Sequence, residues 1–271
     1  FFVFAIMVVA GSKPILHFAM QILHKLGQGL QLVLRTKQAP TLYFLTLSIT
    51  PLLGSLITEP AAMTLAAFLL RDLVYRHKCS TPLLFGTLGV LFVNISIGGT
   101  LTNFAAPPVL MVASTWGWDS AFMFANFGHE ATIAIFINAT IATLLFHKQL
   151  IEPTSKSDQV RIPLAITAIH LLFLLGIVAF AHDPVIFMWL LLFFIGYTTA
   201  YPKHQSPLIL REALLVGFFL AGLVVLGGLQ GWWLQPILET MSPTAVFYGS
   251  LALTAITDNA ALTYLGSLVQ G

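Results

Sequence analysis

The sequence predicts an all-α, polytopic membrane protein with re-entrant hairpins, broken helices and inverted-topology repeats. Three observations predict this fold class. The chain of 271 residues is 58% hydrophobic and only 8% charged, whereas a soluble domain carries about 25% charged residues. Long apolar segments alternate with short basic loops, and a motif with a central acid occurs near residues 57–64 and again near residues 256–263.

The composition also limits the partners of the chain. Its length allows seven or eight spans of about 20 residues, so the expected surrounding is a lipid bilayer. The formal net charge is only +2, and the basic residues are dispersed among short loops. This dispersal gives no basic patch, so no nucleic-acid partner is expected. The single cysteine, Cys79, cannot form an internal disulfide.

The duplicated motif is the feature around which the chain is organised. Residues 57–64 read ITEPAAMT and residues 256–263 read ITDNAALT, with Glu59 and Asp258 in corresponding positions. The copies lie about 200 residues apart, which is too long for a solenoid repeat. This spacing suits the two halves of a membrane transporter.

Residues 1–38 are expected to contain the end of an N-terminal span followed by a basic cytoplasmic or interfacial segment. Residues 1–10 are apolar. Residues 11–38 contain four basic residues and no acid. Because cytoplasmic loops are enriched in Lys and Arg, we expect this segment in the cytoplasm or at its surface.

Residues 39–147 are expected to form the transport unit of the first repeat, which begins with a re-entrant hairpin over 41–76. Both flanks of this apolar run are basic, and a single straight span would place them on opposite sides. Pro60 lacks an N–H group and disfavours a helical Glu59, so the two half-helices should meet at Thr58-Glu59-Pro60. Such a break at membrane depth requires burial in protein or a cavity.

A broken helix over 82–115 and a span over 120–147 complete the first unit. The broken helix contains Gly98-Gly99, then hydroxyl and amide side chains, then Pro107-Pro108. Unwinding there would free backbone groups to bind ions or substrate. Trp116 and Trp118 suit the outer membrane interface.

The second half is expected to repeat this order in the opposite orientation. Residues 148–162 are predicted to be a cytoplasmic loop, residues 163–240 scaffold spans, and residues 241–271 an incomplete second hairpin. The basic loops are assigned to the cytoplasm, and the spans between them are counted. On this count the first motif enters the membrane from the cytoplasmic side and the second from the outside, which predicts an inverted repeat. If the halves match, about 40 residues precede Phe1 and about 80 follow Gly271, so we expect a fragment truncated at both ends.

Three segments, 54–64, 94–113 and 254–265, resemble the ion transporter superfamily, which includes arsenite pumps, D-type sodium/proton antiporters and divalent-anion/sodium symporters. Gly98-Gly99 through Pro107-Pro108 resembles its Asn-Ile-Gly-Gly…Pro-Pro segment. Within it, the chain is most similar to a bacterial family of sodium/proton antiporters. The resemblance implies a scaffold domain and a transport domain, often in a homodimer, with elevator-like motion, in the bacterial inner membrane.

The predicted function is exchange of a monovalent cation, Na⁺, for protons, with no resident cofactor and no enzyme activity. An ionised carboxylate is costly at membrane depth, which suits a group that trades H⁺ for Na⁺. Na⁺ prefers oxygen ligands, so Glu59 and Asp258 are the candidate Na⁺ ligands. The candidate ion- and proton-binding residues are Thr58, Glu59, Asn94, Gly98, Gly99, Thr100, Thr102, Asn103, Thr257, Asp258 and Asn259.

Other interpretations stay open on the sequence alone. The two acids could cap the half-helices that follow them. Helix N-termini also favour anions, which allows an ion-coupled transporter of arsenite or a carboxylate. An intramembrane aspartyl protease would need two close acids, but no Gly-x-Gly-Asp motif is present. His129-Glu130 could be a proton relay or a structural polar pair, while Asn138 and Thr140 are expected to form interhelical hydrogen bonds.

Overall fold

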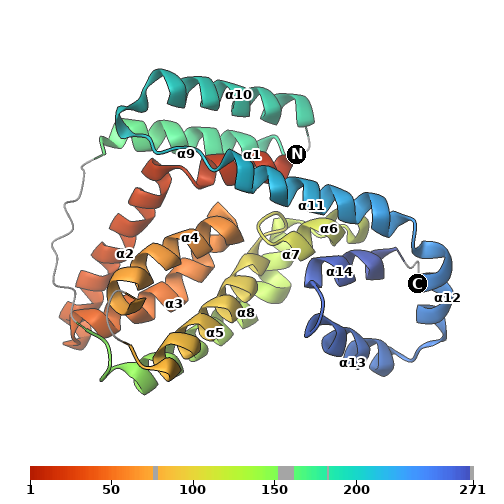
Figure 1. Cartoon of the computed structure of the whole chain (residues 1–271), viewed down its shortest axis with the longest axis horizontal. Coiled ribbons are helices and arrows are strands. Elements are labelled where there is room, and N and C mark those ends of the chain that lie inside the picture. The colour runs from red at the N-terminus through yellow and green to blue at the C-terminus, as the bar shows by residue number, and fades with distance from the viewer. Residues whose placement is uncertain (76–78, 152–161, 182, 269–271) are drawn as a thin grey trace.

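The computed structural model describes residues 1–75, 79–151, 162–181 and 183–268, and every regular element in these ranges is a helix (Figure 1). The first part of the chain contains α1 (Phe2–Ala10), α2 (Lys13–Leu34), α3 (Gln38–Ile57), α4 (Glu59–Leu70), the π-helix η1 (Arg71–Tyr75), α5 (Thr81–Gly98), the 3₁₀-helix η2 (Gly99–Leu101), α6 (Pro107–Trp116), α7 (Ser120–Met123), the π-helix η3 (Phe124–Gly128) and α8 (His129–Phe146). The second part contains α9 (Leu164–Ala179), α10 (Pro184–Ala200), the 3₁₀-helix η4 (Pro202–His204), α11 (Leu210–Gly228), α12 (Gly231–Thr240), α13 (Pro243–Thr254) and α14 (Asn259–Ser267).

The described helices confirm a multi-pass membrane protein. Within the described ranges, four helices are long and apolar enough to cross a membrane, or up to five if a bent helix pair counts as one span. The four are Gln38–Ile57, Thr81–Leu101, Ser120–Phe146 and Leu210–Gly228. The apolar helices α4, α9 and α10 are shorter than these.

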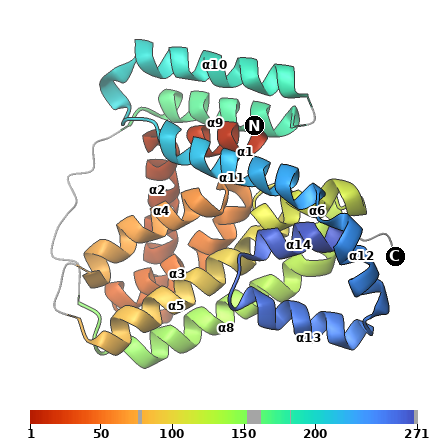
Figure 2. The same cartoon turned by 45° about the vertical axis from the view of Figure 1, so that its right-hand side comes forward.

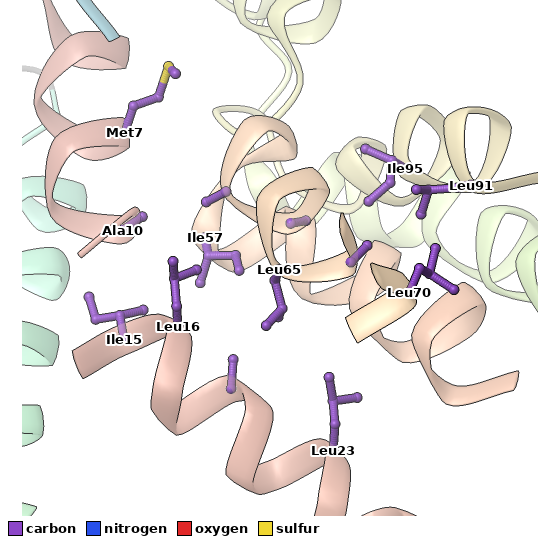
Figure 3. Packing of buried hydrophobic residues seen from close by; sticks show 14 of the residues in the cluster. Met7, Ala10, Ile15, Leu16, Leu23, Ile57, Leu65, Leu70, Leu91 and Ile95 are labelled. Atoms are coloured by element: carbon purple, nitrogen blue, oxygen red, sulfur yellow. The ribbon is translucent and has the colours of Figure 1, made fainter. Parts of the chain in front are cut away.

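The bent pair is α1 and α2, whose axes differ by 61°. One face of α2, including Ile15, Leu16 and Leu23, packs into the hydrophobic core together with α1 and the α3–α4 pair (Figure 3). Residues 11–38 are therefore more deeply packed than a surface segment would require. The side of the membrane on which they lie stays a prediction.

Helices α3 and α4 meet at Thr58 and pack closely against each other along their length. Small residues allow this approach, because a Cβ atom added at Gly54 would lie 3.3 Å from the Cβ atom of Ala62. Helix α5 packs beside both of them, and α8 packs against α3 and α5. The hairpin is thus held inside a bundle of helices.

The second part of the chain lies around this bundle. Helices α9, α10 and α11 pack against α1, and α14 packs against α6 and α11 (Figure 2). Helix α13 contains no buried residue among those described. The contact of α14 with α6 is what brings the second copy of the motif toward the break in the first half.

Candidate functional site

Thr58 occupies a strained backbone position at the tip of the first hairpin. Its φ of 75° and ψ of 153° lie in a region that is essentially restricted to glycine. The residue is 2% exposed, and its Oγ1 has no hydrogen-bond partner among the residues that the structure describes. A buried hydroxyl without a partner is costly, so this oxygen is available to a ligand.

Glu59 begins α4, and its half-buried carboxylate lies against the backbone of Gly99. A Cβ atom added at Gly99 would lie only 2.6 Å from Glu59 Oε1 and 2.8 Å from its Cγ. A side chain at residue 99 would require the Glu59 carboxylate to move. The structure therefore brings together the tip of the hairpin and the first residue of the broken segment.

Gly98 has a different role from Gly99. A Cβ atom at Gly98 would collide with the backbone carbonyl of Pro51 in α3. This glycine allows close helix packing, which is one of the interpretations that the sequence left open. Gly98 therefore allows the contact between α5 and α3, and Gly99 contacts the Glu59 carboxylate.

Ser55 joins α3 to the break in α5, although the sequence analysis did not single it out. Its hydroxyl donates to the carbonyl of Gly98 and accepts from the N–H of Leu101 at 3.1 Å. The Thr102 hydroxyl donates to the carbonyl of Ser55 at 2.8 Å. These bonds satisfy backbone groups that the end of α5 would leave unpaired. The sequence signal that could have identified Ser55 is its hydroxyl, which lies three residues before Thr58 at the tip.

The other polar residues of the break are engaged by the protein. The Thr100 hydroxyl donates to the carbonyl of Ile97 at 2.7 Å. The Asn103 amide donates to the carbonyl of Trp118 at 3.2 Å and accepts from the Ser120 hydroxyl at 2.8 Å. These hydrogen bonds hold the backbone of the break in place. Within the described residues, neither Thr100 nor Asn103 forms a hydrogen bond with the Glu59 carboxylate.

Asn94 is fully buried and links three helices. Its amide donates to the carbonyl of Leu47 in α3 at 2.7 Å and to that of Ile135 in α8 at 3.3 Å, and it accepts from Asn138 at 2.9 Å. The interhelical hydrogen bond predicted for Asn138 is confirmed. The one predicted for Thr140 is wrong, because its hydroxyl donates to the carbonyl of Phe136 in its own helix.

The second tip is more open than the first. Asp258 caps α14, accepting hydrogen bonds from the N–H groups of Ala260 at 2.8 Å and Ala261 at 3.2 Å. The Thr257 hydroxyl donates to the carbonyl of Leu253 at 3.0 Å. Thr257, Asp258 and Asn259 are all exposed. Capping by Asp258 is therefore present, as one of the open interpretations expected.

The second tip is brought toward the first half of the chain by the packing of α14 against α6. Each tip carries one carboxylate, that of Glu59 at the first residue of α4 and that of Asp258 at the N-cap of α14. A carboxylate is stabilised by a nearby cation and neutralised by a bound proton. The arrangement can therefore hold either a proton or a cation.

Comparison with known proteins identifies the family of the chain. Searches of curated proteins and of solved structures find no match to the chain. A family model described as "Putative Na+/H+ antiporter" matches residues 1–271. A match over this whole range, together with the membrane-spanning helices, places the chain among transporters and not among enzymes. The chain belongs to this Na⁺/H⁺ antiporter family.

Proposed function

We propose that the protein exchanges Na⁺ for H⁺ at a single site formed by the two hairpin tips. The observation that carries the proposal is the position of Glu59, whose carboxylate rests on Gly99 at the break that follows α5. The family description names the same two ions.

In this proposal Na⁺ is bound by oxygen atoms from both hairpin tips, the one at Glu59 and the one at Asp258. The Glu59 carboxylate and the unpartnered Thr58 hydroxyl supply them from one side. Asp258 supplies a second carboxylate, and its cap leaves one carboxylate oxygen uncommitted. Backbone carbonyls of the break between α5 and α6 are further candidates.

Competition between the two ions gives coupled exchange. Na⁺ binding favours the ionised acids and expels a proton, and protonation on the other side of the membrane releases Na⁺. A site open to only one side at a time then moves the ions in opposite directions. Whether one acid or both take up protons sets the coupling ratio.

The same proposal includes an inverted repeat, placement in the ion transporter superfamily and location in the bacterial inner membrane. The paired motifs and the alternation of basic loops support it. An anion transporter is less well supported, because a free helix N-terminus would be needed at the tip. At α14 the Asp258 carboxylate already accepts from the first N–H groups.

The test uses everted vesicles from cells that lack their own antiporters. A pH gradient is preset and followed with a fluorescent dye, and Na⁺ and then K⁺ are added. Na⁺ should collapse the gradient in the wild type but not in Glu59→Gln or Asp258→Asn. Asp258→Asn is informative because asparagine is also a good N-cap and removes only the charge.

Asp183→Asn is the matched control for Asp258→Asn. Asp183 also caps a helix, accepting from the N–H of Ile186 at 3.4 Å, and it belongs to the scaffold segment. This variant should exchange Na⁺ like the wild type. If no monovalent cation collapses the gradient although the protein is folded and inserted, the proposed function is wrong.

A further inference from the structure

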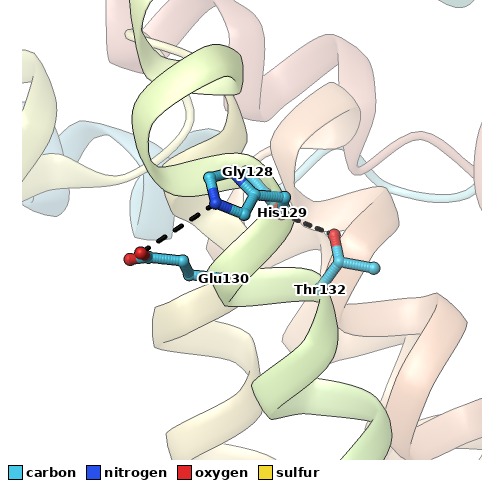
Figure 4. Close-up of polar contacts among 4 residues, drawn as sticks. All are labelled: Gly128, His129, Glu130 and Thr132. Atoms are coloured by element: carbon cyan, nitrogen blue, oxygen red, sulfur yellow. Dashed lines mark hydrogen bonds and ion pairs between the residues drawn. The ribbon is translucent and has the colours of Figure 1, made fainter.

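Two ionisable side chains, His129 and Glu130, lie on an exposed helix face that is mostly apolar. His129 Nε2 is 3.9 Å from Glu130 Oε1, and the side chains are 64% and 73% exposed (Figure 4). At helical spacing below Glu130 follow Ile133, Ile137 and Ile141, each more than half exposed. Such a stripe suits hydrocarbon, so a carboxylate and an imidazole at its start require an explanation.

The pair lies inside a candidate membrane span. Residues Ser120–Phe146 form this span of 27 residues. At 1.5 Å per residue, His129 is roughly 14 Å from Ser120, about a third of the way along a helix about 40 Å long. Above it, Trp118 lies 5.5 Å from both Phe122 and Phe127, measured between ring centroids. Aromatic clusters of this kind are typical of the membrane interface.

No other charge compensates the pair within the described part of the bundle. The elements in main contact with α8 are α3, α5 and η3. None of them contains Asp, Glu, Lys, Arg or His. The only titratable side chain on α3 or α5 is Tyr43, and its hydroxyl lies 2.8 Å from that of Thr87. With an ionised Glu130 and a neutral His129, the pair would carry an uncompensated negative charge.

The pair is also linked to the break at which Glu59 lies. Helix α8 follows directly from the π-helix η3, and η3 packs against η2. The first residue of η2 is Gly99, on which the Glu59 carboxylate rests. Single-turn π-helices inside α-helices frequently occur at functional sites.

We propose that His129 and Glu130 form a second proton-binding site, separate from the hairpin tips, that loads and unloads one H⁺ during transport. The proton comes from water and returns to water, and only an O–H or N–H bond forms and breaks. One bound proton makes the pair neutral overall, which lowers the cost of holding it in hydrocarbon. This inference rests on the proposed Na⁺/H⁺ exchange.

The test measures the pH profile of Na⁺-driven exchange by the full protein in everted vesicles, between about pH 6 and pH 9. The variants are Glu130→Gln and His129→Gln. Either variant should move the midpoint of the profile by about one pH unit or more, while the apparent Na⁺ affinity stays within about twofold. The exchanged variant His129→Glu/Glu130→His keeps both groups and should restore the wild-type profile.

The matched control is Glu212→Gln, which removes another exposed carboxylate, but in the first turn of a span instead of further along it. Its profile should superimpose on that of the wild type. The inference is overturned if both pair variants keep the wild-type midpoint, whether at full activity or at an activity lowered equally at every pH. If exchange is lost in Glu59→Gln but its pH profile is unchanged in Glu130→Gln and His129→Gln, only this inference is overturned. If the wild type shows no exchange, the proposed function is overturned as well.

Discussion

Gly99 is the residue at which a single methyl group should have the largest effect on the site. In Gly99→Ala the new Cβ would lie 2.6 Å from Glu59 Oε1, so the carboxylate must move. Overpacking of this kind costs about 1–3 kcal/mol. We expect Na⁺-driven exchange in vesicles to fall about tenfold or more.

Gly89→Ala in α5, the helix that precedes Gly99, is the control. A Cβ atom at Gly89 would meet nothing within 4 Å. Alanine also favours the helical state by about 0.5–1 kcal/mol relative to glycine. This variant should keep full exchange and the same or a higher unfolding temperature. Equal Na⁺-driven exchange by Gly99→Ala and Gly89→Ala would contradict the position of the Glu59 carboxylate beside Gly99.

Thr58 provides a second test at the residue scale, because stability and function should respond in opposite directions. Thr58→Val removes a buried hydroxyl that has no partner, which relieves a penalty of about 1–3 kcal/mol. We expect the unfolding temperature to stay the same or rise. If this hydroxyl binds Na⁺, the affinity for Na⁺ should fall about tenfold, measured by titration of the purified protein.

Thr58→Ser is the companion variant, because it keeps the hydroxyl and loses only a methyl group. Its Na⁺ affinity should stay close to that of the wild type. Unchanged Na⁺ affinity in Thr58→Val would show that the hydroxyl is not a ligand.

At the scale of helices, Asn94 holds α3, α5 and α8 together. Asn94→Leu removes all three of its hydrogen bonds, to the carbonyls of Leu47 and Ile135 and to Asn138. Interhelical hydrogen bonds in membranes contribute about 0.6–2 kcal/mol each. The free energy of unfolding, measured by reversible unfolding in detergent, should fall by about 1–3 kcal/mol.

Two further variants set the scale for Asn94. Asn138→Leu removes only one of the three bonds, so its effect should be smaller. Thr140→Ala removes a hydroxyl that bonds within its own helix and should change stability by less than about 0.5 kcal/mol. The reverse order of these effects would contradict the role of Asn94 as the central link.

Local chemistry explains which helix ends could be predicted. Pro60 and the Gly98–Pro108 segment restrict or release the backbone directly, and α3 ends at Ile57 while η2 ends at Leu101, beside these residues. The π-helices η1 and η3 carry no such signal in the sequence. They depend on how neighbouring helices pack, which a single sequence does not display.

The same distinction applies to the site. The acids at the two tips could be predicted because an ionised group is rare in an apolar segment. The bonds of Ser55 and the linking role of Asn94 could not, because they depend on carbonyl groups from helices more than 40 residues away. Asn94 and Asn103 are predicted as ion ligands from their place in the broken helix, and their amides donate hydrogen bonds to backbone carbonyls of distant segments.

At the scale of the whole molecule, the orientation of the two tips can be tested through the single cysteine. Cys79 lies beside a basic loop and is partly exposed, so a membrane-impermeant thiol reagent should reach it only from the cytoplasmic face. In a Cys79→Ser background, Glu239→Cys in α12 should react only from the opposite face. Labelling of both positions from one face would contradict an inverted arrangement.

The central claim is that Na⁺ and H⁺ compete for one site at Glu59. The most direct test is calorimetric titration of the purified protein with Na⁺ in two buffers that differ in their enthalpy of ionisation. The difference between the buffers gives the number of protons released for each Na⁺ bound. We predict release of about one proton in the wild type and none in Glu59→Gln. Na⁺ binding without proton release, or release that persists in Glu59→Gln, would contradict the claim.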